Sequence, residues 1–166
     1  MPSKTWYALY VKSRSEKKVA NDFDLDGVDY YLPLQKKLKQ WSDRKKWIEE
    51  PLFRSHVFVN IDQKQYDEVL HTPNVVKFIS FEGKAVAIRN EQIEAIRYYL
   101  NEKDPESIEN QRWDVGKKVE IVSGSMQGLR GELINLKGKN KVKIEIEVVG
   151  KTLIIELPKS KLVFVT

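Results

Sequence analysis

The sequence contains no cysteine and only two histidines. Without thiols the chain cannot form disulfides, zinc–thiolate sites or a cysteine nucleophile, and this composition is typical of a reducing, cytoplasmic environment. No apolar run approaches the ~20 residues that a membrane-spanning helix needs, and residues 1–5 lack the apolar segment of a signal peptide. We therefore expect a cytoplasmic protein with no membrane partner.

Catalytic signatures are also missing. The histidines, His56 and His71, occur in no H-x-x-x-H pattern, and the chain has no G-x-S-x-G, Walker-type or G-x-G-x-x-G sequence. Gly124, Gly128 and Gly131 lie between predicted strands with no helix after them, so we assign them to turns and not to a phosphate-binding loop. The sequence predicts a binding protein and not an enzyme, with no catalytic residue, no cofactor and no metal.

Length and charge define a chain with room for one medium domain or two small ones. With 166 residues, 41% of them hydrophobic and 10% aromatic, it can build packed cores. Its formal net charge of +5 permits a polyanionic partner without requiring one. Residues 102–112 are polar and acidic and contain Pro105, which predicts a flexible linker between a domain at residues 1–101 and another at residues 113–166.

The first of these domains shows both strand and helix patterns. Residues 6–12 have the aromatic and β-branched composition of a strand, and Ser13 or Ser15 can begin a helix that Gly27 ends. Further elements follow, with strands at residues 28–33, 52–61, 75–81 and 85–88 and helices after Asp62 and Asn90. This order predicts an α+β fold with an antiparallel sheet and helices on one face.

Residues 51–61 (PLFRSHVFVNI) are the most apolar and β-prone run of the first hundred residues. With a period of two, Phe53, Ser55, Val57, Val59 and Ile61 share one face, whereas Arg54, His56, Phe58 and Asn60 share the other. A cation, an imidazole and an aromatic ring on one face have two explanations. Either both faces of the strand are buried, or the second face presents an aromatic side chain to a partner.

A basic segment precedes this strand. Residues 34–51 carry Trp41 and Trp47 on either side of a turn at residues 42–43, which predicts a long hairpin with a basic tip. Clustered cations beside aromatic rings suit contact with nucleic acid. A solvated turn, with the two tryptophans packed across it, explains the same residues. The cations concerned are Lys36, Lys37, Lys39, Arg44, Lys45 and Lys46.

The residues after the linker carry only strand and turn patterns. Within residues 142–149, apolar and charged side chains alternate strictly from Val142 to Val148, and turns recur at residues 123–124, 128–131, 137–141 and 150–151. Five short strands with frequent turns predict a small β-barrel, which removes unpaired sheet edges.

These segments together resemble the NusG family of transcription elongation factors. Residues 6–10 (WYALY), 31–33 (YLP), 51–53 (PLF), 57–59 (VFV) and 75–79 (VVKFI) are similar to the family's N-terminal domain, and residues 119–133 (VEIVSGSMQGLRGEL) resemble a KOW motif. The resemblance covers nearly the whole chain in the family's domain order. It implies an NGN-like domain followed by a five-stranded, SH3-like KOW barrel.

The resemblance implies a protein that binds RNA polymerase and suppresses pausing. In the family the N-terminal domain docks on the clamp helices of the largest polymerase subunit, and the matching residues here are Tyr10, His56, Phe58 and Phe81. His71 and Thr72 match the loop that turns toward the gate loop of the second-largest subunit. The family's KOW barrel recruits ribosomal protein S10 or Rho, and the matching residues are Met126, Leu129 and Arg130.

The longer basic hairpin and the altered motifs resemble a specialised paralogue of the RfaH/UpxY antiterminator type, and two departures from the family pattern matter. Residues 54–56 (RSH) replace a proline, a small residue and a tyrosine, so an imidazole takes the place of one aromatic pocket wall. In the RfaH branch, basic and polar residues of the first helix read non-template DNA. Residues 21–26 make that face acidic here, and because acidic side chains repel phosphate, this reading mode is not carried over. The candidate nucleic-acid contacts that remain are the hairpin cations and Lys12, Arg14 and Lys18.

A second hypothesis is a KOW-type RNA- or ribosome-binding protein. Tight RNA binding by the barrel with a steep salt dependence would favour it, whereas the polymerase hypothesis requires that Tyr10, Phe58 and Phe81 face solvent. We expect a monomer in either case. Because residues 142–149 and 153–157 are strongly β-patterned, we also predict a stable barrel that does not refold as a helical hairpin, as the RfaH domain can.

Overall fold

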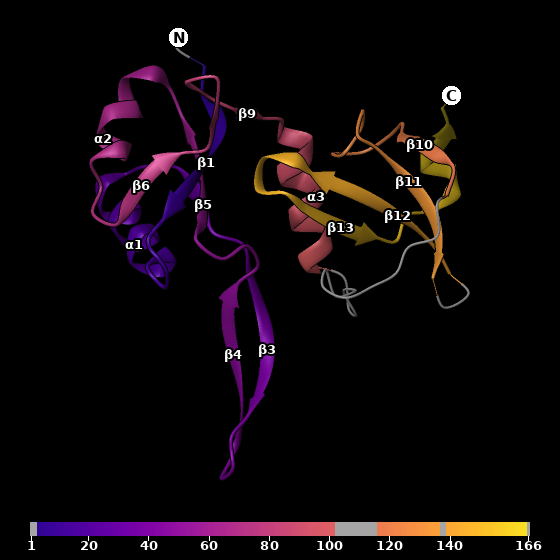
Figure 1. Cartoon of the computed structure of the whole chain (residues 1–166). Helices are drawn as coiled ribbons and strands as arrows, with labels where there is room; N and C mark the ends of the chain where they lie inside the picture. The colour runs from indigo at the N-terminus through magenta and orange to yellow at the C-terminus, as the bar shows by residue number, and fades with distance from the viewer. Residues whose placement is uncertain (1–2, 102–115, 137–138, 166) are drawn as a thin grey trace. The chain divides into compact units, whose positions relative to one another are not determined.

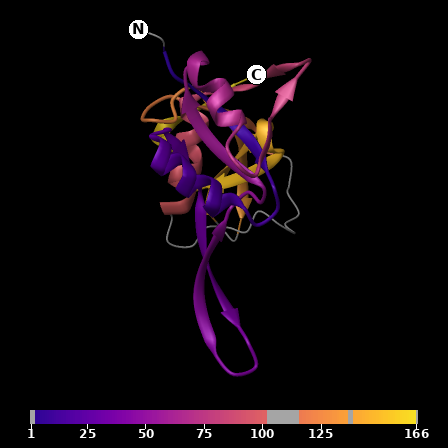
Figure 2. The same ribbon diagram turned by 90° about the vertical axis from the view of Figure 1, so that its left-hand side faces the viewer.

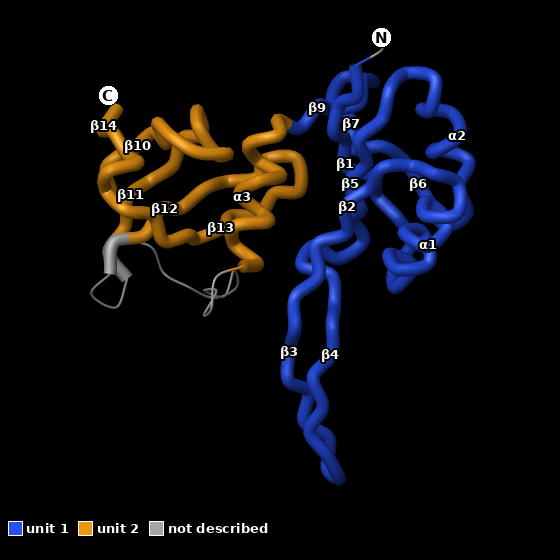
Figure 3. The backbone as a smooth tube through the Cα atoms, turned by 180° about the vertical axis from the view of Figure 1, so that it is seen from behind, with its two compact units in different colours: residues 1–88 blue, residues 89–166 orange. Residues whose placement is uncertain are grey.

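The computed structural model describes residues 3–101, 116–136 and 139–165. The chain divides into two compact units, Met1–Ile88 and Arg89–Thr166 (Figure 3). This boundary differs from the predicted one, because the helix at Asn90–Asn101 groups with the C-terminal strands and not with the N-terminal domain. The predicted linker at residues 102–112 lies outside the described residues.

The first unit is a mixture of strands and short helices, as predicted (Figure 1). Its elements in chain order are β1 (Thr5–Val11), α1 (Glu16–Asp26), β2 (Tyr30–Tyr31), β3 (Leu34–Gln40), β4 (Lys45–Pro51), β5 (His56–Ile61), the 3-10 helix η1 (Gln63–Gln65), α2 (Tyr66–Leu70), β6 (Val75–Phe78), β7 (Ser80–Phe81), β8 (Lys84–Ala85) and β9 (Ala87–Ile88). The main sheet has the order β2-β5-β1-β6, with β9 also paired to β1, and its pairs are antiparallel. The predicted α+β fold is therefore confirmed.

The core of this unit lies between the sheet and the helices. Leu9, Val57 and Val59 from the central strands are fully buried with Val19 and Phe23 of α1. The helix ends at Gly27, whose φ of 72° is the left-handed conformation that favours glycine. Ser15 precedes the helix as predicted, although its side chain makes no capping hydrogen bond.

The central strand is shorter than predicted and is buried on both faces. Strand β5 begins at His56 and not at residue 52, because Ser55 turns the chain with a φ of 62°. Val57, Phe58 and Val59 are all fully buried. The first explanation of the alternating pattern is therefore correct for Phe58, and the expectation of an exposed Phe58 is wrong.

The basic segment forms the predicted hairpin. Strands β3 and β4 pair from Leu34 with Pro51 to Gln40 with Lys45, and the Trp41 N–H donates to the Arg44 carbonyl oxygen (2.8 Å) across the tip. Figures 1 and 2 show this hairpin projecting from the main sheet of the first unit. At its base, the Lys17 ammonium of α1 donates to the Glu49 carbonyl oxygen (2.8 Å).

The second unit contains the predicted five strands. Its elements are α3 (Asn90–Asn101), β10 (Lys118–Ile121), β11 (Arg130–Leu136), β12 (Lys139–Ile146), the 3-10 helix η2 (Glu147–Val149), β13 (Lys151–Ile155), the 3-10 helix η3 (Lys159–Lys161) and β14 (Leu162–Phe164). The strands form one antiparallel sheet in the order β13-β12-β11-β10-β14. The Tyr98 hydroxyl of α3 donates to the Glu156 carbonyl oxygen (2.8 Å), which fixes the helix to the segment after β13.

Gly131 was predicted to lie in a turn, but it lies inside β11, where it pairs with Val119. A Cβ atom at this position would collide with the carbonyl oxygen of Lys143 and lie 2.9 Å from Cγ1 of Val142. The glycine therefore permits the close approach of β11 and β12. Gly124 and Gly128 have φ values of 88° and 96°, as turn glycines do.

Candidate functional site

Three strands of the first unit bring Tyr10, His56 and Lys77 side by side. Tyr10 of β1 is the register partner of His56 on β5 and of Lys77 on β6, so the three side chains lie on the same face of the sheet. The rings of Tyr10 and His56 meet edge to face with centroids 6.1 Å apart. Tyr10 is 40% exposed. This face of the sheet, at the end of β1 and the start of β5, thus offers an aromatic ring, an imidazole and a cation to solvent.

His56 is held in place by its own loop. Its Nδ1 lies 2.7 Å from the Arg54 carbonyl oxygen. Because a carbonyl can only accept, this contact assigns the ring proton to Nδ1 and leaves Nε2 as an acceptor in the neutral ring. The imidazole therefore presents an oriented polar edge beside the Tyr10 ring.

Phe58 lies on the same strand but supports this surface from inside. Its ring packs against Phe53 in an edge-to-face arrangement (6.0 Å) and against Tyr31 (6.5 Å), and it is 0% exposed. Direct contact between Phe58 and a partner would require these two rings to move. The predicted role of Phe58 as a contact residue is thus replaced by a packing role.

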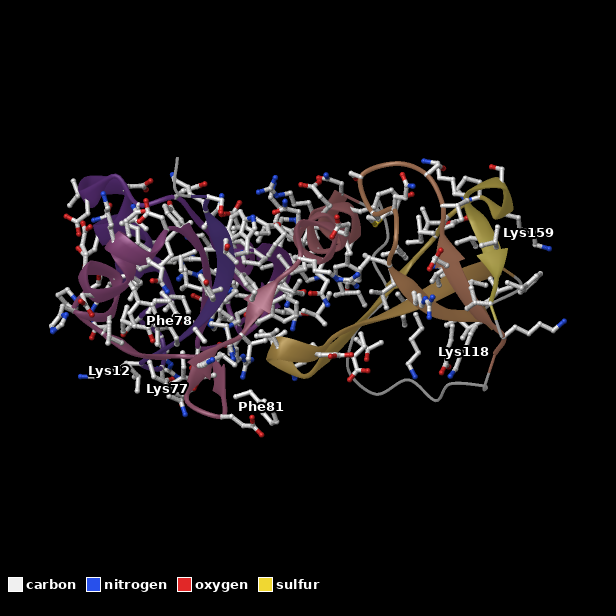
Figure 4. All side chains as sticks on the ribbon, turned by 90° about the horizontal axis from the view of Figure 1, so that it is seen from above. Lys12, Lys77, Phe78, Phe81, Lys118 and Lys159 are labelled. Carbon is white, nitrogen blue, oxygen red and sulfur yellow. The ribbon has the colours of Figure 1, made fainter. Side chains whose placement is uncertain are left out.

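Phe81 is the most exposed aromatic ring of the first unit. It ends β7 next to a turn made by Glu82 and Gly83, both with positive φ, and it is 72% exposed. Figure 4 shows its side chain at the rim of the unit, whereas Phe78 lies among other side chains. Phe78 is buried between the rings of Tyr7 and Tyr66. A short hairpin therefore holds Phe81 in solvent, as its predicted contact role requires.

The two residues predicted to face the gate loop differ in accessibility. Thr72 is buried, and its hydroxyl donates to the Glu68 carbonyl oxygen (3.2 Å) at the end of α2. His71 is exposed and its Nδ1 lies 2.6 Å from the Asp67 carbonyl oxygen. Thr72 thus finishes the helix, and His71 alone is accessible at this corner.

The predicted partner residues of the second unit are mostly core residues. Met126 and Leu129 are buried, so they cannot form an apolar contact surface without rearrangement. Arg130 is exposed, and its Nε donates to the Glu120 carboxylate (3.0 Å). Only Arg130 of the three is therefore available to a partner.

The candidate nucleic-acid contacts are all accessible. Lys12, Arg14 and Lys18 are exposed around the start of α1, and the six hairpin cations are exposed as well. The acidic end of α1 is partly engaged, because Asp24 accepts a hydrogen bond from the Tyr30 hydroxyl (2.8 Å). Burial, and then this hydrogen bond and the negative charge of Asp24, raise the pKa of Tyr30 above its ordinary value.

Metal-ligating side chains are not clustered in the part of the chain that the structure describes. No group of three or more histidine, aspartate or glutamate side chains there could hold a metal ion. Among the same residues, no helix is long and apolar enough to cross a membrane. The accessible features of the candidate site are aromatic and cationic side chains, which are common in binding surfaces.

A family model described as "Transcription termination factor nusG" matches residues 4–97, more than half of the chain. The chain belongs to the NusG family. It is 22% identical to the transcription termination/antitermination protein NusG of Rickettsia felis over 166 residues, which covers 93% of this chain and 86% of that one. It is 25% identical to the NusG protein of Chlamydia trachomatis over 155 residues, with 85% of each chain covered.

A solved structure supports the same fold. The chain is similar to Thermotoga maritima NusG, from a study of domain interaction in that protein, with a TM-score of 0.54, 22% identity and 98% of each chain covered. Family membership makes this chain a NusG-like transcription termination/antitermination factor, and its named relatives are transcription factors and not enzymes.

Some features of the site could not be found in the sequence. Lys77 joins the surface only because β6 pairs with β1, and nothing in residues 75–81 indicates that register. The burial of Phe58 depends on Phe53 and Tyr31, which come from a turn and from a two-residue strand. The sequence around β5 is rich in aromatic residues, which pointed to this region. That composition does not distinguish a ring packed in the core from a ring exposed to solvent.

Proposed function

We propose that this NusG-family chain binds RNA polymerase through the accessible side chains of Tyr10, His56 and Phe81, and thereby promotes elongation and antitermination. The observation that carries the proposal is the exposure of Phe81 on a hairpin whose backbone holds it in solvent. A large apolar ring kept out of the core is typical of a binding surface. The clamp helices of the polymerase are the partner that the family resemblance implies.

The size of the contribution follows from the area that each ring would bury. Complete burial of a phenylalanine side chain favours association by about 1.5–3 kcal/mol before the entropic cost of binding. Phe81 has most of its surface still to bury, and Tyr10 less than half. Phe81 is therefore the larger apolar anchor, and Tyr10 with His56 supplies a ring edge and a polar group of defined orientation.

Further contacts complete the proposal. His71 faces the gate loop, and exposed Arg130 marks the part of the second unit that recruits ribosomal protein S10 or Rho. The long basic hairpin supports a specialised role of the RfaH/UpxY type, with non-template DNA reached by Lys12, Arg14, Lys18 and the hairpin cations in place of the acidic face at Asp24 and Asp26. The chain acts as a monomer in the cytoplasm.

Binding of the full chain to the cognate RNA polymerase core tests the proposal. Phe81→Ala should weaken binding roughly 10- to 100-fold, and Tyr10→Ala by less, because it exposes less ring. Leu25→Ala is the matched control, since Leu25 is an apolar residue of α1 that is 78% exposed and lies outside the proposed surface. Equal binding by Phe81→Ala and Leu25→Ala would refute the proposed surface, and no binding by the unaltered chain would refute the function.

A second function is favoured by one observation on the other unit. The Lys117 ammonium lies 5.3 Å from the centroid of the Phe164 ring, and Phe164 is an exposed residue of the edge strand β14. A cation beside an accessible ring suits a nucleotide, so this edge is the contact expected of an RNA- or ribosome-binding KOW unit. Loss of RNA binding in Phe164→Ala, with polymerase binding absent in the unaltered chain, would establish this alternative.

A further inference from the structure

The register of the β3–β4 hairpin sorts its side chains onto two different faces. Residues paired directly across the strands share a face, and alternate pairs share the same face again. One face, here called the apolar face, carries the pairs Lys36–Glu49, Leu38–Trp47 and Gln40–Lys45. The opposite face, here called the cationic face, carries Gln35–Glu50 at the base and then Lys37–Ile48 and Lys39–Lys46, and it continues to Trp41 and Arg44 at the tip.

Charge is distributed unequally between these faces. On the apolar face, Lys36 stands directly opposite Glu49, so its charge has a partner of opposite sign. On the cationic face, Lys37 forms an ion pair with Glu50 (3.1 Å) near the base. Lys39 and Lys46 stand directly opposite each other, and neither has an ion pair within the described residues.

Two lysines placed directly across a hairpin repel each other and destabilise the pairing. Both are exposed, so the hairpin folds in spite of this repulsion and not because burial compensates for it. An anion between the two ammonium groups would remove the repulsion. A phosphate of a polyanionic chain supplies such a charge, and it releases condensed counterions when it binds.

Trp41 lies next to this lysine pair, and a contact with Arg44 orients its ring. The Arg44 guanidinium lies 5.3 Å from the centroid of its ring, which engages one side of the indole by a cation–π contact. Its backbone N–H closes the tip by bonding to the Arg44 carbonyl oxygen. Trp41 as a residue is nevertheless 42% exposed, so the tip holds an oriented aromatic side chain that is accessible to a partner.

We propose that the cationic face of the hairpin binds single-stranded nucleic acid, with a base stacked on Trp41 and phosphates held by Lys39, Lys46 and Arg44. Stacking requires a base whose face is free, which a single strand offers and an intact duplex does not. Stacking on Trp41 and phosphate contacts from Lys39, Lys46 and Arg44 carry no base-sequence information, so we expect binding to tolerate different base sequences. The inference deepens the proposed function, because it assigns the nucleic-acid contact of a transcription factor to one face of one hairpin.

The hairpin supplies its own matched controls. Trp47 is the same residue type on the same hairpin, is 65% exposed, and lies on the apolar face. Lys36 is likewise the control for Lys39, since it is an exposed lysine of the same strand on the opposite face. Equal effects from Trp41 and Trp47, or from Lys39 and Lys36, would show that the face does not matter.

The test measures binding of the full chain, without polymerase, to fluorescein-labelled 20-nucleotide dT and rU strands and to a 20-base-pair duplex, between 50 and 200 mM salt. Trp41→Ala should weaken single-strand binding roughly 10- to 100-fold, whereas Trp47→Ala changes it less than about 2-fold. The double variant Lys39→Gln/Lys46→Gln should reduce the slope of log K against log salt by about 1.4, and Lys36→Gln should leave it nearly unchanged. The dT and rU arms distinguish DNA from RNA as the strand that is bound.

Indole fluorescence gives a readout that folding defects do not imitate. Addition of dT or rU should quench the emission of the Trp47→Phe chain, and this quenching should be absent from Trp41→Phe. The inference is overturned if the duplex binds as tightly as the single strands, if Trp41→Ala and Trp47→Ala are equivalent, or if the strands do not bind. Because the assay contains no polymerase, these failures are separate from a failure of Phe81→Ala to affect polymerase binding.

Discussion

Replacement of Phe58 by alanine gives the sharpest test of how the first unit is built. In the structure this ring is fully buried against Phe53 and Tyr31. Truncation of a buried phenylalanine removes its transfer free energy and leaves a cavity, which together destabilise a domain by about 3–5 kcal/mol. If Phe58 instead faced solvent, as its position in the alternating pattern allows, the same substitution would cost no more than about 0.5 kcal/mol.

The assay is native-state hydrogen exchange of the β1 and β5 amides combined with urea unfolding, because exchange reports the stability of the unit that contains each amide. Phe81→Ala is the control, since it removes an equal ring from an exposed position and should change stability by less than about 0.5 kcal/mol. A loss below about 1 kcal/mol in Phe58→Ala would refute the reasoning. It would mean that Phe53 and Tyr31 do not form a packed cluster with this ring.

The stability of Phe58→Ala also determines how a measurement of its polymerase binding is interpreted. A domain is stable by only about 5–15 kcal/mol, so Phe58→Ala removes a large part of that margin. Loss of polymerase binding in Phe58→Ala would therefore report partial unfolding and not a lost contact. Phe81, which is exposed, is the residue whose substitution tests the contact itself.

Three further predictions concern individual elements. Gly131→Ala should lower the free energy of unfolding of the second unit by about 1–3 kcal/mol in urea, because the new methyl group meets the Lys143 carbonyl oxygen; a neutral result would contradict the close approach of β11 and β12. The pKa of Tyr30 is raised above its ordinary value of 10.0, so the protonated hydroxyl stabilises the folded chain below that pH. The difference in unfolding free energy between the unaltered chain and Tyr30→Phe should therefore shrink as pH rises from 10 through the folded-state pKa. A difference that does not change with pH would contradict this prediction. Asp62→Ala should lower the unfolding free energy by about 1 kcal/mol, because the Asp62 side chain accepts from the third backbone N–H in a complete capping box, and an unchanged urea midpoint would show that the cap is not formed.

Much of the architecture could be predicted from local patterns. Gly27 and Asp62 mark a helix end and a helix start because a left-handed backbone and an N-terminal acceptor are local requirements. The basic hairpin follows from two β-compatible segments around a polar turn, and its strands pair over seven residues each. The strict alternation of residues 142–149 predicts the inward side of β12, where Val142, Ile144 and Ile146 are buried.

The features that local patterns could not supply depend on contacts between distant segments. A period of two places Phe58 and Val57 on opposite faces, but it cannot say whether the second face is covered, and Phe53 and Tyr31 cover it. Gly131 has the sequence context of a turn, and only its pairing with Val119 shows that it serves strand packing. Met126 and Leu129 likewise lie in a turn-rich segment, yet that segment folds back and buries them.

In the β3–β4 hairpin, the pairing register restricts the candidate nucleic-acid contacts to one face. Composition alone describes its six cations and two tryptophans as one basic aromatic cluster, in which each residue is an equal candidate for contact with nucleic acid. Pairing divides them, because Lys36 faces Glu49 while Lys39 faces Lys46, and because Arg44 lies over Trp41 and not over Trp47. Electrostatic repulsion and an oriented ring therefore coincide on one face only. A cluster that served solubility alone would gain nothing from this arrangement, whereas a face that binds a charged strand with exposed bases uses both features at once.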